Sequence, residues 1–398
     1  MKPNKIGVTG ATGQVGAAVV KHLHEQGIPV VAVARNALGA ALIDASVPDC
    51  EIRIGGTSRI DGKHVLDDCE TILNCAIASS GGNPRQAYAR NRALVNGLLE
   101  AKSLRWLVHF STVAIFGELI KKHRDEQRAF DHPRPDSEYG RSKLHVERYA
   151  ARRSNERGVK CTVLRLGHVY GAGIGRSREI IELSRDPGFR LPFDGRNPSN
   201  AIHVDRLALS IIALLDAAPG RDTYSFAEKA NTWRDIFDWH ARAIGIAPVP
   251  AMSDADSEKV HALWARASVT RDIGNWVRGL PIKRLVRSPA LFDLALRILS
   301  KTPEGVTKRV TDMNRRIGAR GTVASSLGSY NKLIPALYVS AGMPGPFLDL
   351  APIPATGSGS ESERSAELRA WYLGWSSPRL GPPSRPRVSE GAAAVDGR

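Results

Sequence analysis

Cysteine is scarce in this sequence, and no targeting or membrane-spanning segment is evident. The four cysteines among 398 residues include no C-x-x-C pair, so we expect reduced, buried thiols and neither a disulfide framework nor a metal site. No apolar run reaches the roughly 18 to 20 residues that a bilayer span requires. Residues 1–5 are too short and too polar for a signal peptide. The sequence therefore predicts a cytoplasmic protein that is soluble or at most peripheral to a membrane.

Acidic residues are outnumbered, with 40 Asp and Glu against 56 Lys and Arg and a formal net charge of +16. Much of the excess is local, because Lys259 to Lys332 holds 15 basic and 4 acidic residues. Such a segment could meet phosphates, anionic lipid or an acidic partner, or could be a solvated helical surface. We favour packing onto the rest of the protein, keep peripheral contact with an anionic membrane as the minority interpretation, and expect no specific nucleic acid.

A glycine-rich turn at the start of the chain organises the fold. Ile6 to Val8 is a short apolar strand, and an apolar helical pattern and a second strand over 28–34 follow the turn. This arrangement is typical of a dinucleotide site, in which glycines permit a tight turn, close approach of a pyrophosphate and close helix packing. The expected cofactor contacts of the turn are Gly10, Thr12, Gly13, Gln14, Val15 and Gly16.

Strand-like runs alternate with helical patterns through the first 170 residues. This alternation predicts right-handed crossovers and a doubly wound parallel sheet, with ligands beyond the carboxyl ends of its strands. The later strands are expected at 51–54, 71–76, 106–110 and 160–166.

The carboxyl ends of two of these strands bear on the cofactor. The second strand ends at Ala34, without an acid to accept hydrogen bonds from ribose hydroxyls, and Arg35 follows it. A guanidinium there can clamp a 2′-phosphate, or it can stack on adenine with either cofactor. NADP is therefore modestly favoured within NAD(P). Ala76, at the end of the fourth strand, is a further expected cofactor contact.

Two adjacent hydroxyl residues, Ser111 and Thr112, follow the end of the fifth strand. Tyr139 and Lys143 lie further along the chain on a predicted helix, with Ser137 as its N-cap. The spacing of four residues places the phenol and the ammonium on one helix face. A nearby lysine can lower the pKa of a tyrosine, which then serves as an acid or base near neutral pH.

The glycine turn, the S-T-x-x-x-x-G segment and the Y-x-x-x-K helix together resemble the short-chain dehydrogenase/reductase superfamily, in its extended branch of sugar-nucleotide epimerases, dehydratases and reductases. The resemblance covers residues 5 to about 245. It implies that Tyr139 is the acid/base, that Thr112 supplies the hydroxyl and that Lys143 orients the nicotinamide ribose. It also implies that Asn91 supports the site geometry through its helix.

The resemblance also implies a substrate side. Ser111 would be an auxiliary substrate contact, and His168 takes a place where the family often has asparagine. Arg176 and Arg196 could hold a diphosphate, although ordinary surface charge is the alternative for both. We expect strand-like pieces near 190–193 and 223–227 and a helix from Thr232 to Ile244.

The expected architecture is a Rossmann-like α/β fold, a doubly wound parallel sheet with a smaller α+β substrate lobe and a mainly helical C-terminal extension. The NAD(P)-binding domain would occupy residues 1–170 and the substrate lobe 171–250, with some strands returning to the main sheet. The basic extension would occupy 251–376, with helices from Ser288 and over 361–375. A disordered tail would occupy 377–398.

The resulting hypothesis is an NAD(P)-dependent enzyme that epimerises or reduces a nucleotide sugar, with a homodimer left open. A dehydratase is disfavoured because Val113-Ala114 stands where the family's dehydratases place Asp-Glu. One alternative is an NADPH-dependent reductase of a non-sugar ketone. Another is a non-catalytic cofactor-sensing binding protein, against which the intact triad Thr112, Tyr139 and Lys143 argues.

Overall fold

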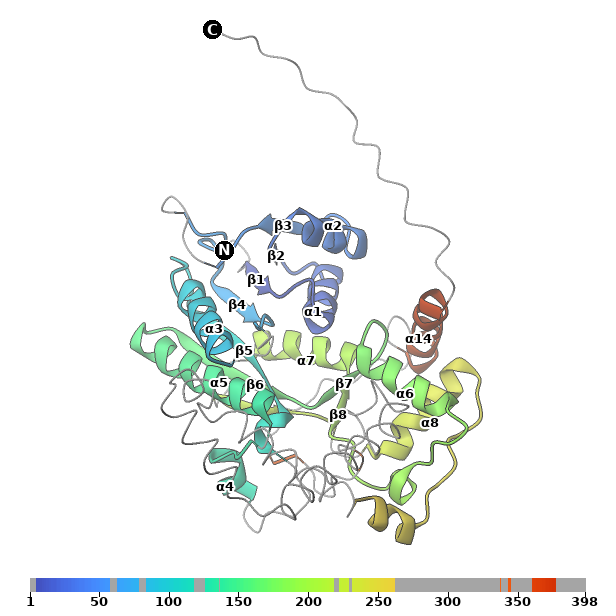
Figure 1. Cartoon of the computed structure of the whole chain (residues 1–398). Helices are drawn as coiled ribbons and strands as arrows, with labels where there is room; N and C mark the ends of the chain where they lie inside the picture. The colour runs from blue at the N-terminus through green and yellow to red at the C-terminus, as the bar shows by residue number, and fades with distance from the viewer. Residues whose placement is uncertain are drawn as a thin grey trace, which may run out of the picture.

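Seven parallel strands form one sheet in the order β3-β2-β1-β4-β5-β6-β9 (Figure 1). The computed structural model describes residues 5–57, 63–78, 84–117, 126–135, 137–217, 222–228, 231–261, 337, 343–344 and 360–376. The strands are β1 Ile6–Thr9, β2 Val30–Ala34, β3 Glu51–Ile54, β4 Thr71–Asn74, β5 Trp106–Thr112, β6 Lys160–Leu166 and β9 Thr223–Phe226. The order reverses between β1 and β4, which creates a crevice at their carboxyl ends. The predicted doubly wound sheet is confirmed.

Helices cover both faces of the sheet. Alternate residues of β5 enter two cores, because successive strand side chains point to opposite faces. The helices that cover the two faces are α1 Gln14–Glu25, α2 Ala37–Ser46, α3 Pro84–Leu98, α5 Glu138–Glu156 and α7 Val204–Asp216. Val108 and Phe110 pack with α1 and α7, whereas Leu107 packs with α3 and α5.

A smaller unit lies beside the carboxyl ends of the sheet. Its two short strands, β7 His168–Tyr170 and β8 Ala201–His203, pair in parallel. The helices α6 Gly175–Arg185 and α8 Trp233–Ile244 pack together, and α14 Glu361–Ser376 packs on α8 (Figure 1). The helices predicted at 232–244 and 361–375 are therefore confirmed.

The prediction of a strand near 190–193 is wrong. Leu191 forms an isolated bridge with Ala251, and the chain then enters the 3₁₀ turn η2, Pro192–Gly195. Proline has no N–H for a ladder, and Phe193 and Asp194 adopt left-handed backbone angles with φ of 48° and 53°. Both features end strand pairing at this point.

The C-terminal part of the chain returns to the edge of the sheet. Met343 donates from its backbone N–H to Asn200 Oδ1 at 2.7 Å, and Ser225 in β9 donates its hydroxyl to the Pro344 carbonyl. The Met343 side chain packs with η1, Val113–Phe116, and with Phe130 of α4, Glu126–Asp131. The basic segment 259–332, the helix expected from Ser288 and the tail 377–398 lie largely or wholly outside the described residues.

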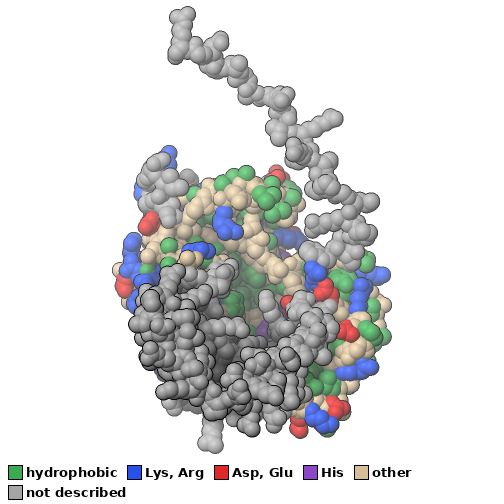
Figure 2. Space-filling model, viewed as in Figure 1, with side chains coloured by type: hydrophobic (Ala, Val, Ile, Leu, Met, Phe, Trp, Pro, Cys, Tyr) green, Lys and Arg blue, Asp and Glu red, His purple; other side chains and the backbone are tan. Residues whose placement is uncertain are grey.

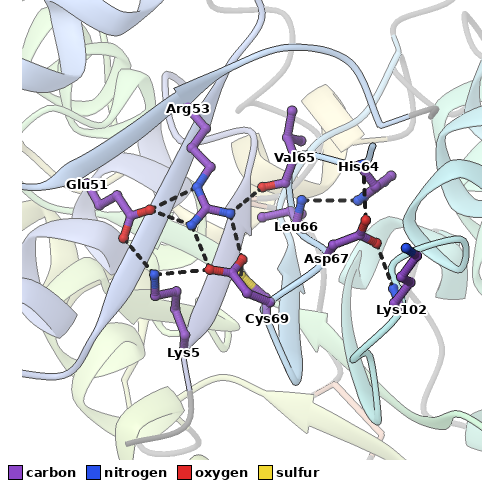
Figure 3. Close-up of polar contacts among 10 residues, drawn as sticks. Lys5, Glu51, Arg53, His64, Val65, Leu66, Asp67, Cys69 and Lys102 are labelled. Carbon is purple, nitrogen blue, oxygen red and sulfur yellow. Dashed lines mark hydrogen bonds and ion pairs between the residues drawn. The ribbon is translucent and has the colours of Figure 1, made fainter. Parts of the chain in front are cut away.

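An ion-pair network ties the edge strand β3 to the amino ends of its neighbours (Figure 3). Arg53 pairs with Glu51 and Asp68, and Lys5 pairs with the same two carboxylates. Hydrogen bonds from Arg53 hold the pKa of Asp68 well below its usual range, against the effect of burial. These groups are partly exposed, so the network contributes modestly to stability. It lies at the opposite end of the strands from the glycine turn.

All four cysteines are free thiols, and Cys50 and Cys69 are buried. Burial raises the pKa of Cys69 and of Cys75 to about 12, so neither is a ready nucleophile at neutral pH. None of the helices within the described ranges is long and apolar enough to cross a membrane.

Candidate active site

The glycine turn has the geometry that a dinucleotide site requires. Gly10 has a φ of 73°, and a Cβ there would lie 2.7 Å from the backbone nitrogen of Ala76. A Cβ on Gly16 would lie 2.2 Å from the Gly10 carbonyl oxygen. Both contacts are with backbone, which cannot move aside as a side chain can. The turn after β1, the start of α1 and the segment after β4 therefore pack closely only because these positions are glycine.

The amino end of α1 is left open for an anion. Gly13 is its N-cap and offers no side-chain hydrogen bond, and the first turn carries no acidic residue. The N–H groups of Gln14, Val15 and Gly16 therefore lack the side-chain cap that most helices have. Such a helix end favours a phosphate through its N–H groups and its dipole. The residues present fit the pyrophosphate of a dinucleotide.

The carboxyl end of β2 lies beside the same turn. Asn36 caps α2 by accepting from the Gly39 N–H at 2.9 Å, and a Cβ on Gly39 would lie 3.2 Å from the Thr12 methyl carbon. Arg35, between β2 and this cap, is exposed. The structure thus brings Thr12 near the start of α2 and leaves the Arg35 side chain at the surface beside them.

Asn91 of α3 is fully buried and links its helix to the segment after β4 by hydrogen bonds. Its Oδ1 accepts from the Ala78 N–H at 2.8 Å, and its Nδ2 donates to the Ala78 carbonyl at 3.0 Å and to the Ala87 carbonyl at 2.9 Å. This segment also carries Ala76, which touches Gly10. Asn91 therefore positions one wall of the expected cofactor site through direct contacts with the backbone.

Thr112 and Tyr139 meet at the carboxyl end of β5. Thr112 ends the strand and caps η1, and its hydroxyl accepts from the Ala114 N–H at 3.3 Å. Ser137 caps α5 as predicted, accepting from the Gly140 N–H at 3.0 Å, and this cap places Tyr139 in the first turn. The Thr112 side chain lies beside the Tyr139 phenol and acts on its pKa. Tyr139 is nevertheless 54% exposed, so the phenol is accessible from outside.

The pKa values of Tyr139 and Lys143 differ from what the sequence led us to expect. Although Tyr139 as a whole is partly exposed, desolvation by the protein around the phenol raises its pKa, and the neighbouring Thr112 side chain acts in the opposite direction. Burial also lowers the pKa of Lys143 to about 8, against the charges of Cys75 and Glu147. Lys143 Nζ donates to the Phe110 carbonyl at 2.9 Å. The expected lowering of the Tyr139 pKa by Lys143 is therefore not seen, because the ammonium faces the β5 backbone and is itself penalised by burial.

Ser111 faces away from Thr112, because successive residues of a strand point to opposite sides. Its hydroxyl donates to Glu147 Oε2 at 2.7 Å, and Arg165 in β6 donates to Glu147 Oε1 at 2.6 Å and to the Phe130 carbonyl at 2.7 Å. All three polar side chains are buried. Ser111 therefore joins a structural network under the site, and the substrate contact expected for it is not supported.

His168 and Arg176 lie together beyond β6. The His168 ring packs on Trp233 with centroids 5.5 Å apart, and burial, with the nearby charge of Arg176, lowers its pKa to about 3. Arg176, near the start of α6, pairs with Glu179 at 2.5 Å. A Cβ on Gly175 would lie 3.1 Å from Gln14 Nε2, so this helix end adjoins the glycine turn. His168 is thus neutral, and Arg176 is close to the cofactor side.

Arg196 lies apart from His168 and Arg176. It follows η2, its side chain is 64% exposed, and it pairs with Asp254 at 2.5 Å. The structure therefore does not bring Arg196 together with the residues around Tyr139. The face drawn in Figure 2 is hollowed near its centre, in the area where β7 and β8 lie in Figure 1.

Sequence reasoning missed two polar residues beside this site. His109 in β5 is buried against Asn74, with 3.0 Å between His109 Nδ1 and Asn74 Nδ2, and burial together with the Lys143 charge lowers its pKa to about 3. Glu147 lies one turn after Lys143 on the same helix. The sequence did offer a signal for both, because His109 and Glu147 are polar residues at positions where the strand and helix patterns face an apolar core.

The fold and this site define a dinucleotide-binding enzyme of the extended short-chain dehydrogenase/reductase type. Residues 6–186 match the model of the NAD dependent epimerase/dehydratase family. The chain is 34% identical over 255 residues to a probable low-salt glycan biosynthesis reductase, Agl14, from Haloferax volcanii, covering 60% of this chain and 79% of that protein. The chain therefore belongs to the NAD-dependent epimerase/dehydratase family, whose members use a nicotinamide cofactor.

Two other relatives are informative. The chain is 30% identical over 175 residues to dTDP-6-deoxy-L-talose 4-dehydrogenase (NAD(P)(+)) from Kitasatospora kifunensis, covering 43% of this chain but only 54% of that enzyme. The structure resembles that of UDP-glucuronic acid 4-epimerase from Bacillus cereus in complex with NAD, with a TM-score of 0.51, 21% identity and coverage of 62% of this chain and 86% of that one. The latter likeness concerns the fold alone.

Proposed function

We propose that this protein is an NAD(P)-dependent oxidoreductase or epimerase of a nucleotide sugar, with Tyr139 as its proton-transfer residue. The observation that carries the proposal is the Thr112 side chain beside the partly exposed Tyr139, at the same end of the sheet as the open amino end of α1. The relatives named above act on, or are named for, nucleotide sugars and glycan synthesis. The chain spans about half the length of the talose dehydrogenase. The substrate of the present protein is therefore inferred from the chemistry of its site together with its similarity to these relatives.

The cofactor would be held by the open turn and the strand ends around it. The N–H groups at the start of α1 would bind the pyrophosphate, and Thr12 and Arg35 would lie beside the adenosine ribose. Arg35 favours NADP, because a 2′-phosphate offers its guanidinium a charge-assisted partner. When bound, the nicotinamide ring would supply hydride exchange with a sugar carbon.

The roles of the remaining residues follow from their contacts. Tyr139 would exchange a proton with the reacting oxygen, and the Thr112 hydroxyl would hold that oxygen in place. Lys143 has a pKa near 8 and would contact the ribose while anchoring α5 to β5. Asn91 would position the wall that carries Ala76. A cytoplasmic location fits such an enzyme.

Reduction of a non-sugar ketone is the second candidate, and a specific observation favours it. The two guanidinium groups expected to hold a diphosphate, Arg176 and Arg196, are both engaged by carboxylates. A nucleotide sugar would have to displace Glu179 or use other donors, whereas a neutral ketone would not.

A substrate panel separates these functions. The full chain would be incubated with nucleotide sugars and with ketones in the presence of each of the oxidised and reduced forms of NAD and NADP, because epimerisation begins with hydride transfer from the sugar to the oxidised cofactor. The reactions would be followed by nicotinamide absorbance and mass spectrometry. Epimerisation changes the sugar without net cofactor consumption, and reduction consumes it. Turnover of ketones alone would establish the second candidate, and absence of turnover with every substrate would overturn the catalytic proposal.

A further inference from the structure

Three residues late in the chain contact both the smaller unit and the sheet. Leu337 is 1% exposed and packs in the core of the smaller unit. Met343 is also buried, and its backbone N–H donates to Asn200 Oδ1 at 2.7 Å. Pro344 accepts through its carbonyl from the hydroxyl of Ser225 in β9. We call Leu337, Met343 and Pro344 the C-terminal contact.

The Met343 side chain supports the turn that follows Thr112. It packs with Val113, Ile115 and Phe116, which are the buried side chains of η1. Protein interiors are close-packed, so the loss of one member leaves a void toward which the others can move. The position of η1 therefore depends on a side chain more than 200 residues further along the sequence.

η1 in turn touches the helix that carries Tyr139. A Cβ on Gly140 would lie 2.2 Å from the Ala114 carbonyl oxygen, so the backbones of η1 and α5 are in direct contact one residue after Tyr139. Thr112 is the N-cap of η1. A shift of η1 therefore moves the Thr112 hydroxyl relative to the Tyr139 phenol.

Asn200 joins the C-terminal contact to β7, on the substrate side. Its Oδ1 accepts from the Met343 N–H, and its carbonyl accepts from the His168 N–H at 2.8 Å. A Cβ on Gly167 would lie 2.0 Å from the same carbonyl oxygen, so the backbones pack closely here.

The backbone of Asn200 is itself unusual. Asn200 is buried and left-handed, with a φ of 47°. Such angles are uncommon outside glycine, although asparagine tolerates them better than most residues. They persist where the surrounding contacts hold them, and they cluster at functional sites. The contacts that hold Asn200 include one to His168 and one to Met343.

We propose that the C-terminal contact, through Asn200 and η1, positions Thr112 against Tyr139 and against β7. Met343 and Asn200 are then positioning residues, which act through η1 and the β7 backbone. Both lie outside the segment 6–186 that matches the family model, so the rest of this chain supplies the support. The catalytic consequence rests on the proposed function, whereas the link from Met343 to η1 can be measured without substrate.

The first test uses the full chain and hydrogen exchange measured by mass spectrometry. Met343→Ala removes most of the side chain below η1. Asn200→Gly removes the Oδ1 that holds the Met343 N–H, while glycine readily keeps the left-handed backbone. Exchange of the amides of residues 113–117 should quicken at least about tenfold in both variants. Asn200→Gly leaves the core side chains in place, so it decides the matter if Met343→Ala does not fold.

Two variants serve as controls for the exchange measurement. Met343→Leu keeps the apolar volume and should exchange like the wild type. Leu368→Ala opens a comparable void in α14, where Leu368 is fully buried with Ile181 and Ala243 in a separate cluster. It should leave the η1 amides unchanged. Unchanged η1 exchange in both Met343→Ala and Asn200→Gly, or equal quickening in Leu368→Ala, would overturn the link.

The second test measures the catalytic consequence with the substrate that the panel identifies. In Met343→Ala and Asn200→Gly, kcat should fall about 10- to 100-fold, because a small misplacement of reacting groups is costly. The calorimetric Kd of the dinucleotide should not change, and Met343→Leu should keep the wild-type kcat. An unchanged kcat in variants with faster η1 exchange would overturn the positioning role. Absence of wild-type turnover with every substrate would instead overturn the proposed function, and η1 exchange would still decide the link.

Discussion

Lys143 donates from Nζ to the backbone carbonyl of Phe110 at 2.9 Å, which joins the helix that carries Tyr139 to the strand that ends in Thr112. The Ser137 cap sets where α5 begins, and the Lys143 bond holds the first two turns of the helix against β5. The relative position of the Thr112 and Tyr139 hydroxyls thus follows from backbone contacts of their own elements.

Replacement of Tyr139 by phenylalanine removes the group assigned to proton transfer. We expect turnover to fall by about 10² to 10⁴-fold, the usual share of general acid–base catalysis, while calorimetry shows cofactor binding largely intact. Tyr149→Phe is the matched control, because Tyr149 lies on the same helix as Tyr139 but its hydroxyl donates to Asn96 Oδ1 of α3. Undiminished turnover in Tyr139→Phe would remove the assigned mechanism.

Lys143 should make stability depend on pH. Its pKa is about 8, against 10.5 for an unperturbed lysine, so between these values the unfolded chain binds more protons and the free energy of unfolding rises with pH. Lys143→Met should therefore be about 1 to 3 kcal/mol more stable than the wild type at pH 7. Denaturant unfolding should show this gain disappearing above pH 10. A variant that is less stable at both pH values would mean that the bond to Phe110 outweighs the cost of burying the charge.

Gly16→Ala should damage the cofactor turn. The new Cβ would lie 2.2 Å from the Gly10 carbonyl oxygen, so the start of α1 must shift, at a cost of about 1 to 3 kcal/mol in unfolding free energy. Dinucleotide affinity should fall with it. Gly158→Ala is the control, since a Cβ there meets nothing within 4 Å and only its left-handed backbone is strained. Equal effects on dinucleotide binding would argue against a tight turn.

Arg35→Ala should distinguish the two dinucleotides. Loss of a charge-assisted partner for a 2′-phosphate should weaken NADP binding by about 1.5 to 3 kcal/mol and leave NAD binding nearly unchanged. Calorimetry with both dinucleotides measures the difference, and Arg35→Lys should show an intermediate loss. If both affinities fall equally, the guanidinium stacks on adenine.

Arg165→Met should be strongly destabilising. It leaves the Glu147 carboxylate buried without its guanidinium partner, which typically costs about 3 to 5 kcal/mol. The double variant Arg165→Met/Glu147→Leu removes both charges and should recover most of that loss in denaturant unfolding. Additive destabilisation in the double variant would show that the two side chains act independently of each other.

Local patterns predicted much of the fold. The glycine spacing, the strand runs of the first 170 residues and the Ser137 cap each depend on a few neighbouring residues, and the structure confirms the elements that they indicated. Gly10 and Gly16 could be assigned because only glycine satisfies the contacts of such a turn.

Side-chain direction and partners distant in sequence could not be predicted in this way. Ser111 and Thr112 are adjacent, yet strand alternation sends one to Glu147 and the other to Tyr139, and which is which depends on where α5 packs. The pairing of Arg196 with Asp254 and the direction of Lys143 likewise depend on elements brought together by folding.

The return of Met343 and Pro344 to Asn200 and Ser225 has a consequence for synthesis of the chain. A ribosome releases the sheet and the Tyr139 helix long before it reaches these residues, so the apolar cluster of Met343 with Val113 and Phe116 must wait for more than a hundred further residues. A nascent or prematurely terminated chain would leave this cluster open beneath Thr112. Completion of the site would then be one of the last events in folding, and a nonsense mutation well after the Tyr139 segment would still impair it.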